Sequence, residues 1–433
     1  MRFWFLVLFV LQLMVGATSG GDDTLPVERT YRVTSAVLQF SGVLFGYFLL
    51  FGREMFGGKV FWVERKTLWA FLMLAVWVFL DLFAMGAGFW LHYETTYVLG
   101  DFYKFLLLPL LFMLAYFGLR SQRQLDTVLK GLVVVMGIAL LVDFIRRYTW
   151  ITLYGGRFMT SSTFHISTVT PLVLYLLLCG KGSRFFRRIL WVVGFEICAS
   201  IVLLQGLSDY VYAGLLTLIF FYFFRSKKLV LALVLLAGVG FIGLADPFDF
   251  WGEGNYLSRK LEYATVTAAG SQMGVAERVT GSRIGEIIGI LRAYANSPAQ
   301  LPFGFGMGAL DEALPITMAE IPKTEFTPWW QPIHHFIHSG LFEIFYRTGF
   351  AGLVALFALF AHAYRRGRRL ASGPHRDFGR FVMANSVYQL TNIAIQTPIT
   401  YVWLFFVIPL VGSYIVEYAA VQGGAFEISP RMA

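Results

Sequence analysis

The chain has 433 residues, of which 57% are hydrophobic and only 14% are charged, and its mean hydropathy is +0.65. A soluble domain would carry about a quarter charged residues, so a soluble globular protein is excluded. The formal net charge of +9 does not indicate nucleic-acid binding, because many of the lysines and arginines fall in short linkers between apolar runs.

Apolar runs of about 20 residues recur along the chain and predict an all-α, polytopic transmembrane bundle of about twelve spans. Residues 1–20 form either a first spanning helix, which we favour, or a cleaved signal peptide. The later spans are expected near 33–51, 68–87, 98–119, 128–146, 167–180, 189–206, 208–224, 229–246, 337–362, 379–396 and 400–420.

Basic residues gather in alternate linkers and thereby predict the orientation of the bundle. These linkers are residues 52–67, 181–188, 225–228 and 363–378, all expected on the cytoplasmic side. Both ends of the chain then lie inside, and the long polar segment lies outside. The expected division is an N-terminal transmembrane bundle (1–246), a large outer loop (247–336) with short amphipathic helices, and C-terminal transmembrane helices (337–433).

The ionisable and amide residues inside the spans gather toward the outer side in this topology. They are Asp81, Asp101, Lys104, Asp143, Asp209, Glu343, Asn392 and Gln396. Because charge inside a bilayer must be paired or hydrated, we expect a polar vestibule open to the outer face. The alternative is a set of separate helix–helix pairs, such as Asp101 with Lys104.

Residues 282–296 of the outer loop have the pattern of an amphipathic helix that lies on the membrane surface. Ser282 is expected to cap it. Its apolar face would consist of Ile284, Ile287, Ile288 and Leu291. Arg283 is either a solvated arginine or, with the free N–H groups of the first turn, a phosphate ligand. Residues 302–308 follow as a tight glycine turn, which is not a nucleotide fingerprint because no strand precedes it.

The segment 334–353 closes the outer loop and enters an apolar span. His338 and Ser339 are expected at the boundary between water and membrane. Glu343 and Arg347 follow four residues apart, and we expect them to pair with each other, because unpaired charge in a spanning helix is costly. We therefore expect chemistry at this point of the chain.

Three functional classes fit these residues. A transferase would use a lipid diphosphate donor, with arginines stabilising the leaving group and the histidine accepting a proton. A flippase or transporter of anionic lipids is the second class, although the sequence has no apparent paired halves or broken helices. In the third, a structural membrane protein, His338 is only an interfacial residue. Cys179 and Cys198 lie in apolar spans, and we expect no disulfide, metal site or cofactor.

The sequence from His338 fits the pattern H-[NSQ]-x9-G-x-x-[GTY], which ends with Gly349 and Gly352. This pattern resembles the signature of the O-antigen ligase and polymerase superfamily, in which it closes a large periplasmic loop between late spans. The further similar stretches are Gly281-Ser282-Arg283, which opens a helix, the turn Pro302–Gly308, and Gly156-Arg157-Phe158 through His165.

Two positions depart from that family. Ser208-Asp209 stands where members often have Ser-Arg, and His165 stands where asparagine is common. One phosphate contact is therefore either missing or supplied by another cation, such as Arg278 or Lys104.

The resemblance implies a metal-independent, inverting glycosyltransferase of the GT-C type in the bacterial inner membrane, with its active site facing the periplasm. Its donor would be a saccharide on undecaprenyl diphosphate. His338 would act as the base or orient the acceptor hydroxyl, while Arg283 and Arg157 would bind the diphosphate. The possible supporting residues are Ser339, Glu343, Arg278, Ser208 and Asp209. The resemblance leaves three acceptors possible. A lipopolysaccharide ligase would use lipid A-core, a polysaccharide polymerase would use a second lipid-linked unit, and a related protein-glycosylating enzyme would use a protein hydroxyl.

Overall fold

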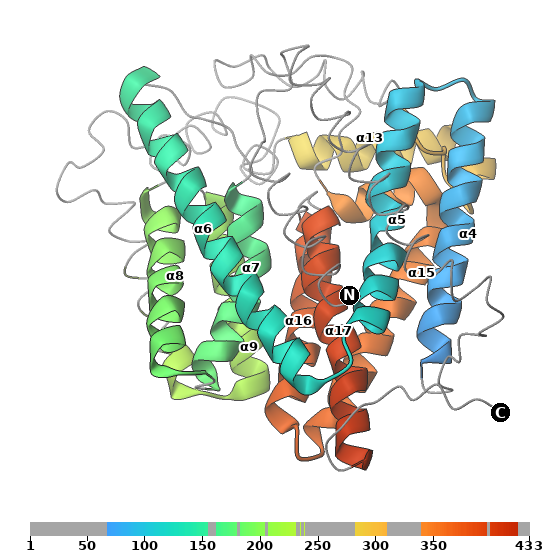
Figure 1. Ribbon diagram of the computed structural model, residues 1–433. Coiled ribbons are helices and arrows are strands. Elements are labelled where there is room, and N and C mark those ends of the chain that lie inside the picture. The colour runs from blue at the N-terminus through green and yellow to red at the C-terminus, as the bar shows by residue number, and fades with distance from the viewer. Residues whose placement is uncertain are drawn as a thin grey trace.

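The computed structural model describes residues 67–154, 162–179, 182–203, 207–230, 234, 238, 282–309, 339–395 and 399–422. Every regular element in these residues is helical (Figure 1). The elements are α4 (Leu68–Trp90), α5 (Thr95–Gly118), α6 (Gln122–Tyr154), α7 (Ser162–Leu178), α8 (Arg184–Leu203), α9 (Leu207–Phe224), α13 (Ser282–Asn296), the 3-10 turn η3 (Pro298–Gln300), α15 (Gly340–Ala371), α16 (Arg376–Ile395) and α17 (Ile399–Gln422). The all-α prediction is confirmed for this part of the chain.

The predicted spans within these ranges all coincide with helices, although α6 and α15 extend further than expected. The expected spans at 1–20 and 33–51, and most of the one at 229–246, lie outside the described residues. The stretches long and apolar enough to cross a membrane are Leu68–Trp90, Tyr97–Gly118, Gln122–Val142 and Gly340–Ala371. The count of twelve spans stays a prediction.

Large apolar side chains remain exposed on the outer faces of the bundle. Trp69 and Phe79 of α4 are 62% and 64% exposed, and Trp191 and Phe195 of α8 are 70% and 73% exposed. Soluble monomers rarely expose contiguous apolar faces of this kind. Together with the apolar helices, these faces indicate a membrane-associated protein.

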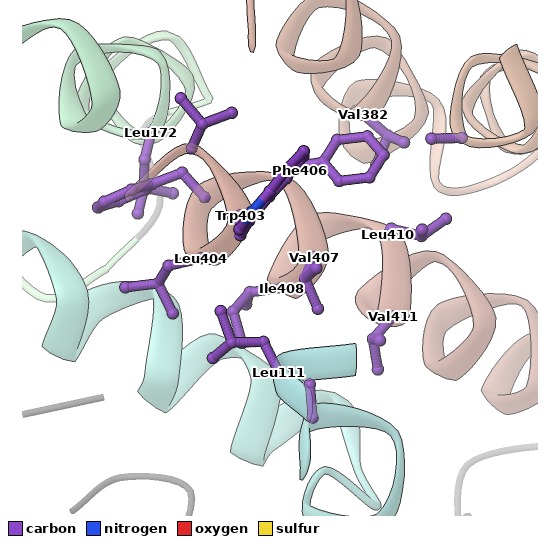
Figure 2. Packing of buried hydrophobic residues seen from close by; sticks show 14 of the residues in the cluster. Leu111, Leu172, Val382, Trp403, Leu404, Phe406, Val407, Ile408, Leu410 and Val411 are labelled. Atoms are coloured by element: carbon purple, nitrogen blue, oxygen red, sulfur yellow. The ribbon is translucent and has the colours of Figure 1, made fainter. Parts of the chain in front are cut away.

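The helix α17 forms the centre of the described bundle (Figure 1). Every residue from Val402 to Val416 is buried, as expected for a helix that is apolar all round. Figure 2 shows its side chains packed against three neighbouring helices, represented by Leu111 of α5, Leu172 of α7 and Val382 of α16. This packing fixes the positions of α5 and α16, which both border the candidate site.

Apart from α13, helices adjacent in the sequence run antiparallel, so the described linkers between them alternate between two ends of the bundle (Figure 1). At one end, Leu125 of α6 and Phe378 of α16 lie against Gly412 of α17, and Phe223 of α9 contacts Tyr364 of α15. The cations that gather here are Arg120, Arg123, Arg184, Arg187, Arg188, Arg225, Lys227, Lys228, Arg365, Arg368, Arg369 and Arg376. We call this the basic end, and the described parts of three predicted basic linkers lie there together. Residues 52–66 of the fourth lie outside the described residues, and the orientation of the bundle stays a prediction.

The opposite end is covered by α13, which lies across the bundle in Figure 1. We call it the α13 end. The linker between α4 and α5, the first turn of α15 and the last turn of α16 all lie there, as Gly88, Ser339 and Ala394 show through their contacts. The glycine turn Pro302–Gly308 lies there too.

Candidate functional site

The helix α15 is broken near its start. Gly349 has φ 67° and ψ −162°, which no helical residue adopts, so a first segment, Gly340–Thr348, is separated from the long remainder. This region of backbone space is essentially restricted to glycine. The break lies eleven residues after His338, where the family-like pattern places its first glycine.

The break exposes backbone groups that need partners, because water is scarce inside a membrane protein. The glycine turn supplies those partners. The bonds are Phe305 N–H to Tyr346 O at 2.8 Å, Gly306 N–H to Arg347 O at 3.2 Å, Phe350 N–H to Leu301 O at 2.9 Å, and Ala351 N–H to Pro302 O at 3.0 Å. Part of the segment predicted to form the outer loop is therefore integral to the helical bundle.

Glycines make this close approach possible. Gly304 has φ 80°, and a Cβ added there would lie 2.5 Å from the carbonyl of Arg347. The turn also reaches α4, where Met307 N–H donates to Ala84 O at 2.9 Å and a Cβ on Gly88 would lie 2.1 Å from Met307 O. The turn therefore lies between α4 and α15, in backbone contact with both helices.

Four ionisable residues lie beside the glycine turn. They are Asp101 and Lys104 of α5, and Glu343 and Arg347 of α15. We call them the ion layer. Asp101 Oδ2 lies 2.9 Å from Arg347 Nε and accepts a 2.9 Å hydrogen bond from Gly308 N–H. Asp101 Oδ1 lies 3.5 Å from Lys104 Nζ, which in turn lies 3.2 Å from Glu343 Oε1. Arg347 also donates from Nη1 to Ala309 O. Asp101 thus links α5, α15 and the glycine turn.

Glu343 and Arg347 were expected to pair with each other, and the structure instead gives each a partner on α5. The i,i+4 spacing places both on one face of the helix, but that face meets α5, whose charges are closer to them. The expected pair of Asp101 with Lys104 is present at 3.5 Å.

Burial differs sharply within the ion layer. Asp101, Glu343 and Arg347 are 0% exposed, whereas the Lys104 side chain is 30% exposed. Glu343 Oε2 has no hydrogen-bond partner among the described residues. Lys104 is therefore the one partly exposed side chain of the layer, with its ammonium held between two carboxylates, and within the described residues Glu343 Oε2 is an unused acceptor.

Ser339 is the N-cap of α15. Its hydroxyl accepts from Phe342 N–H at 3.5 Å and donates to Ala394 O, at the end of α16, at 2.7 Å. The Ser339 side chain is thereby committed to fixing the start of α15, directly after His338. This contact gives Ser339 a structural function as a helix cap, and its predicted supporting role in the site stays a prediction.

The helix α13 has the bounds predicted from sequence, but one residue of its predicted apolar face is not buried. Tyr294 packs on Phe345, with ring centroids 4.5 Å apart, and its hydroxyl donates to Phe345 O at 2.5 Å. Ile290 is buried, whereas Leu291, expected on the apolar face, is 52% exposed. Ile290 and Tyr294 are buried against the first segment of α15. Nothing is described of the side chains of Ile284 and Ile288, so the rest of the predicted face stays a prediction.

The predicted site residues are only partly described. Arg283 lies in the first turn of α13, and Ser208 and Asp209 lie in the first turn of α9, at the α13 end. Nothing is described of these three side chains. His338, Arg157 and Arg278 lie outside the described residues, so their predicted roles stay predictions.

Asp101 was missed as a site residue, although it organises the ion layer. Its signal in the sequence is an acid and a base three residues apart inside an apolar span, because charge in a bilayer is costly unless it is paired or has a function.

Comparison with known proteins assigns no family, since no family model and no curated protein matches this chain.

Proposed function

We propose that this chain is a membrane glycosyltransferase of the O-antigen ligase or polymerase type, with a GT-C-like fold. It transfers a saccharide from an undecaprenyl-diphosphate donor to an acceptor hydroxyl at the periplasmic face of the bacterial inner membrane. The reaction is inverting and independent of metal ions. The alternative is a flippase or transporter of anionic lipid-linked saccharides.

One observation carries this proposal. The glycine turn Pro302–Gly308 and the motif glycine Gly349 resemble the family separately, and they are distant in sequence. In the fold they form one unit joined by backbone hydrogen bonds. Two independent resemblances that meet at one place support a common function better than either resemblance alone.

The chemistry requires a base, an electrophile and a stabilised leaving group. The acceptor oxygen bonds to the anomeric carbon of the sugar as the bond from that carbon to the diphosphate oxygen breaks on the opposite face. In the proposal, His338 accepts the hydroxyl proton, and Arg283 and Arg157 stabilise the departing diphosphate. Lys104, whose side chain is partly exposed, is a further cation at this end of the bundle.

The break in α15 is the observation that favours the alternative, because transporters often bind substrates at broken helices. In such sites the freed backbone groups coordinate the substrate. Here the groups around Gly349 are hydrogen-bonded to the glycine turn, which leaves them unavailable to a transported ion or lipid. We therefore place the transferase first.

The test is transfer by the purified protein in detergent, with chelator present throughout. An undecaprenyl-diphosphate oligosaccharide is the donor, and lipid A-core or excess donor is the acceptor. A single product on lipid A-core identifies a ligase, and a ladder of longer lipid-linked glycans identifies a polymerase. Replacing a general base costs about 10²–10⁴-fold, so we expect His338→Ala to lower the rate by that factor.

His375→Ala, at the basic end, is the matched control and should retain full activity. Full activity in His338→Ala would remove the catalytic role from that residue. Donor binding without transfer to either acceptor would favour the flippase or a protein acceptor, and absence of donor binding would exclude this function.

A further inference from the structure

The first segment of α15 has little stability of its own. Isolated helices shorter than about 12–15 residues are marginal even in favourable sequences, and Gly340–Thr348 is shorter than that. The break at Gly349 also removes the continuous helix that would otherwise fix its rotation. The orientation of the segment must therefore be set by contacts from its sides.

Those contacts come from several elements. Ser339 binds the end of α16, and Phe345 O accepts from Tyr294 of α13. The charged contacts come from α5, where Asp101 and Lys104 meet Arg347 and Glu343. Charged groups enclosed by protein hold their geometry more firmly than exposed pairs, so the ion layer is the part of this support that most restricts rotation.

We propose that the Asp101–Arg347 pair is a positioning device for the residues that precede α15, acting through the first segment. This inference rests on the proposed function, in which His338 takes part in transfer. Both members of the pair are 0% exposed, so neither touches a substrate.

The path from the pair to the site is short and rigid. Glu343 N–H donates to Ser339 O at 2.8 Å, so Ser339 and the ion layer belong to one hydrogen-bonded helical unit. A rotation or shift of that unit displaces Ser339, the residue that directly follows His338 in the sequence. A misplacement of about 1 Å at a reacting group can cost about 10²-fold in rate.

The test uses a charge-balanced double variant, Asp101→Asn/Arg347→Met. The introduced asparagine retains an acceptor for Gly308 N–H, and no single buried charge is left behind. Replacing a buried ion pair in this way is often neutral for stability, whereas removing one partner is not. We therefore expect the melting temperature of the double variant to be close to that of the wild type and above those of both single variants.

Two readouts separate positioning from packing. Amide hydrogen exchange of residues 340–348 should accelerate at least about tenfold in the double variant, and kcat should fall about 10²-fold with the KM for donor unchanged. The matched control is Arg366→Met/Glu417→Leu, which removes a pair between the buried Arg366 of α15 and the partly exposed Glu417 of α17 at the basic end. It should leave both readouts at wild-type values.

Unchanged exchange at residues 340–348, or faster exchange with wild-type kcat, would overturn the positioning role. If the wild type transfers no sugar to any acceptor, the proposed function fails separately. The exchange measurement then still decides whether the pair fixes the segment. Wild-type activity in the double variant would mean that the pair serves folding alone.

Discussion

Gly349 shows how one residue can determine the path of a whole helix. Its φ of 67° and ψ of −162° end the first segment of α15, and a Cβ there would lie 2.4 Å from Gly304 N. The two glycines touch backbone to backbone, so neither can be replaced without moving the other. The sequence pattern identified Gly349 as a motif residue but gave no sign that it breaks the helix, because glycines in other spans, such as Gly86, remain helical.

We expect Gly349→Ala to destabilise the protein by about 1–3 kcal/mol from backbone strain alone, with the clash against Gly304 adding to that. The melting temperature in detergent measures the change. Gly86→Ala is the control, because a Cβ there meets nothing within 4 Å. Equal melting temperatures of the two variants would contradict a fixed break at Gly349.

At the scale of elements, hydropathy predicted which segments are helical, because crossing a bilayer imposes length and apolar composition. It could not predict which helices meet. Lys104 and Glu343 are 239 residues apart in sequence, and the helical spacing of Glu343 and Arg347 pointed to a local pair in place of two distant ones. The burial of Ile290 and Tyr294 in α13 likewise depends on the first segment of α15, which the pattern of α13 alone does not reveal.

The docking of α13 depends on one buried hydroxyl. Burial raises the pKa of the Tyr294 hydroxyl, so it stays protonated and donates to Phe345 O. We expect Tyr294→Phe to cost about 1 kcal/mol and therefore to accelerate amide exchange in α13 about fivefold. Tyr222→Phe, at a side chain that is 70% exposed, is the control. Unchanged exchange in α13 would show that ring packing alone holds the helix.

The whole molecule has two chemically different ends. Arginine and lysine linkers gather at the basic end, and the glycine turn, the ion layer and α13 gather at the other. This separation was predictable from charge alone, because the positive-inside rule acts on short linkers. The way the outer loop completes the bundle was not predictable, since it depends on backbone contacts between the turn and α15.

Cysteine labelling tests the orientation of these ends. In a background with Cys179 and Cys198 replaced by serine, we expect a membrane-impermeant maleimide to label Ser297→Cys only from the periplasmic side. The same reagent should label Gly373→Cys, in the linker between α15 and α16, only from the cytoplasmic side. Labelling of both positions from one side would contradict the placement of the two ends on opposite sides of the membrane. Reversed labelling would show that the candidate site faces the cytoplasm.

The ion layer also has a consequence for the making of the protein. Asp101 and Lys104 emerge from the ribosome well before Glu343, which lies 239 residues after Lys104 and completes its contact. At about 5–20 residues per second, α5 therefore spends roughly 10–50 s without its partners on α15. During that interval its acid and base have each other, three residues apart on one helix, which keeps the inserting helix neutral. Late insertion of α15 then adds Arg347 and Glu343 to this local pair, which persists in the complete layer. A chain truncated before α15 would keep only the local pair.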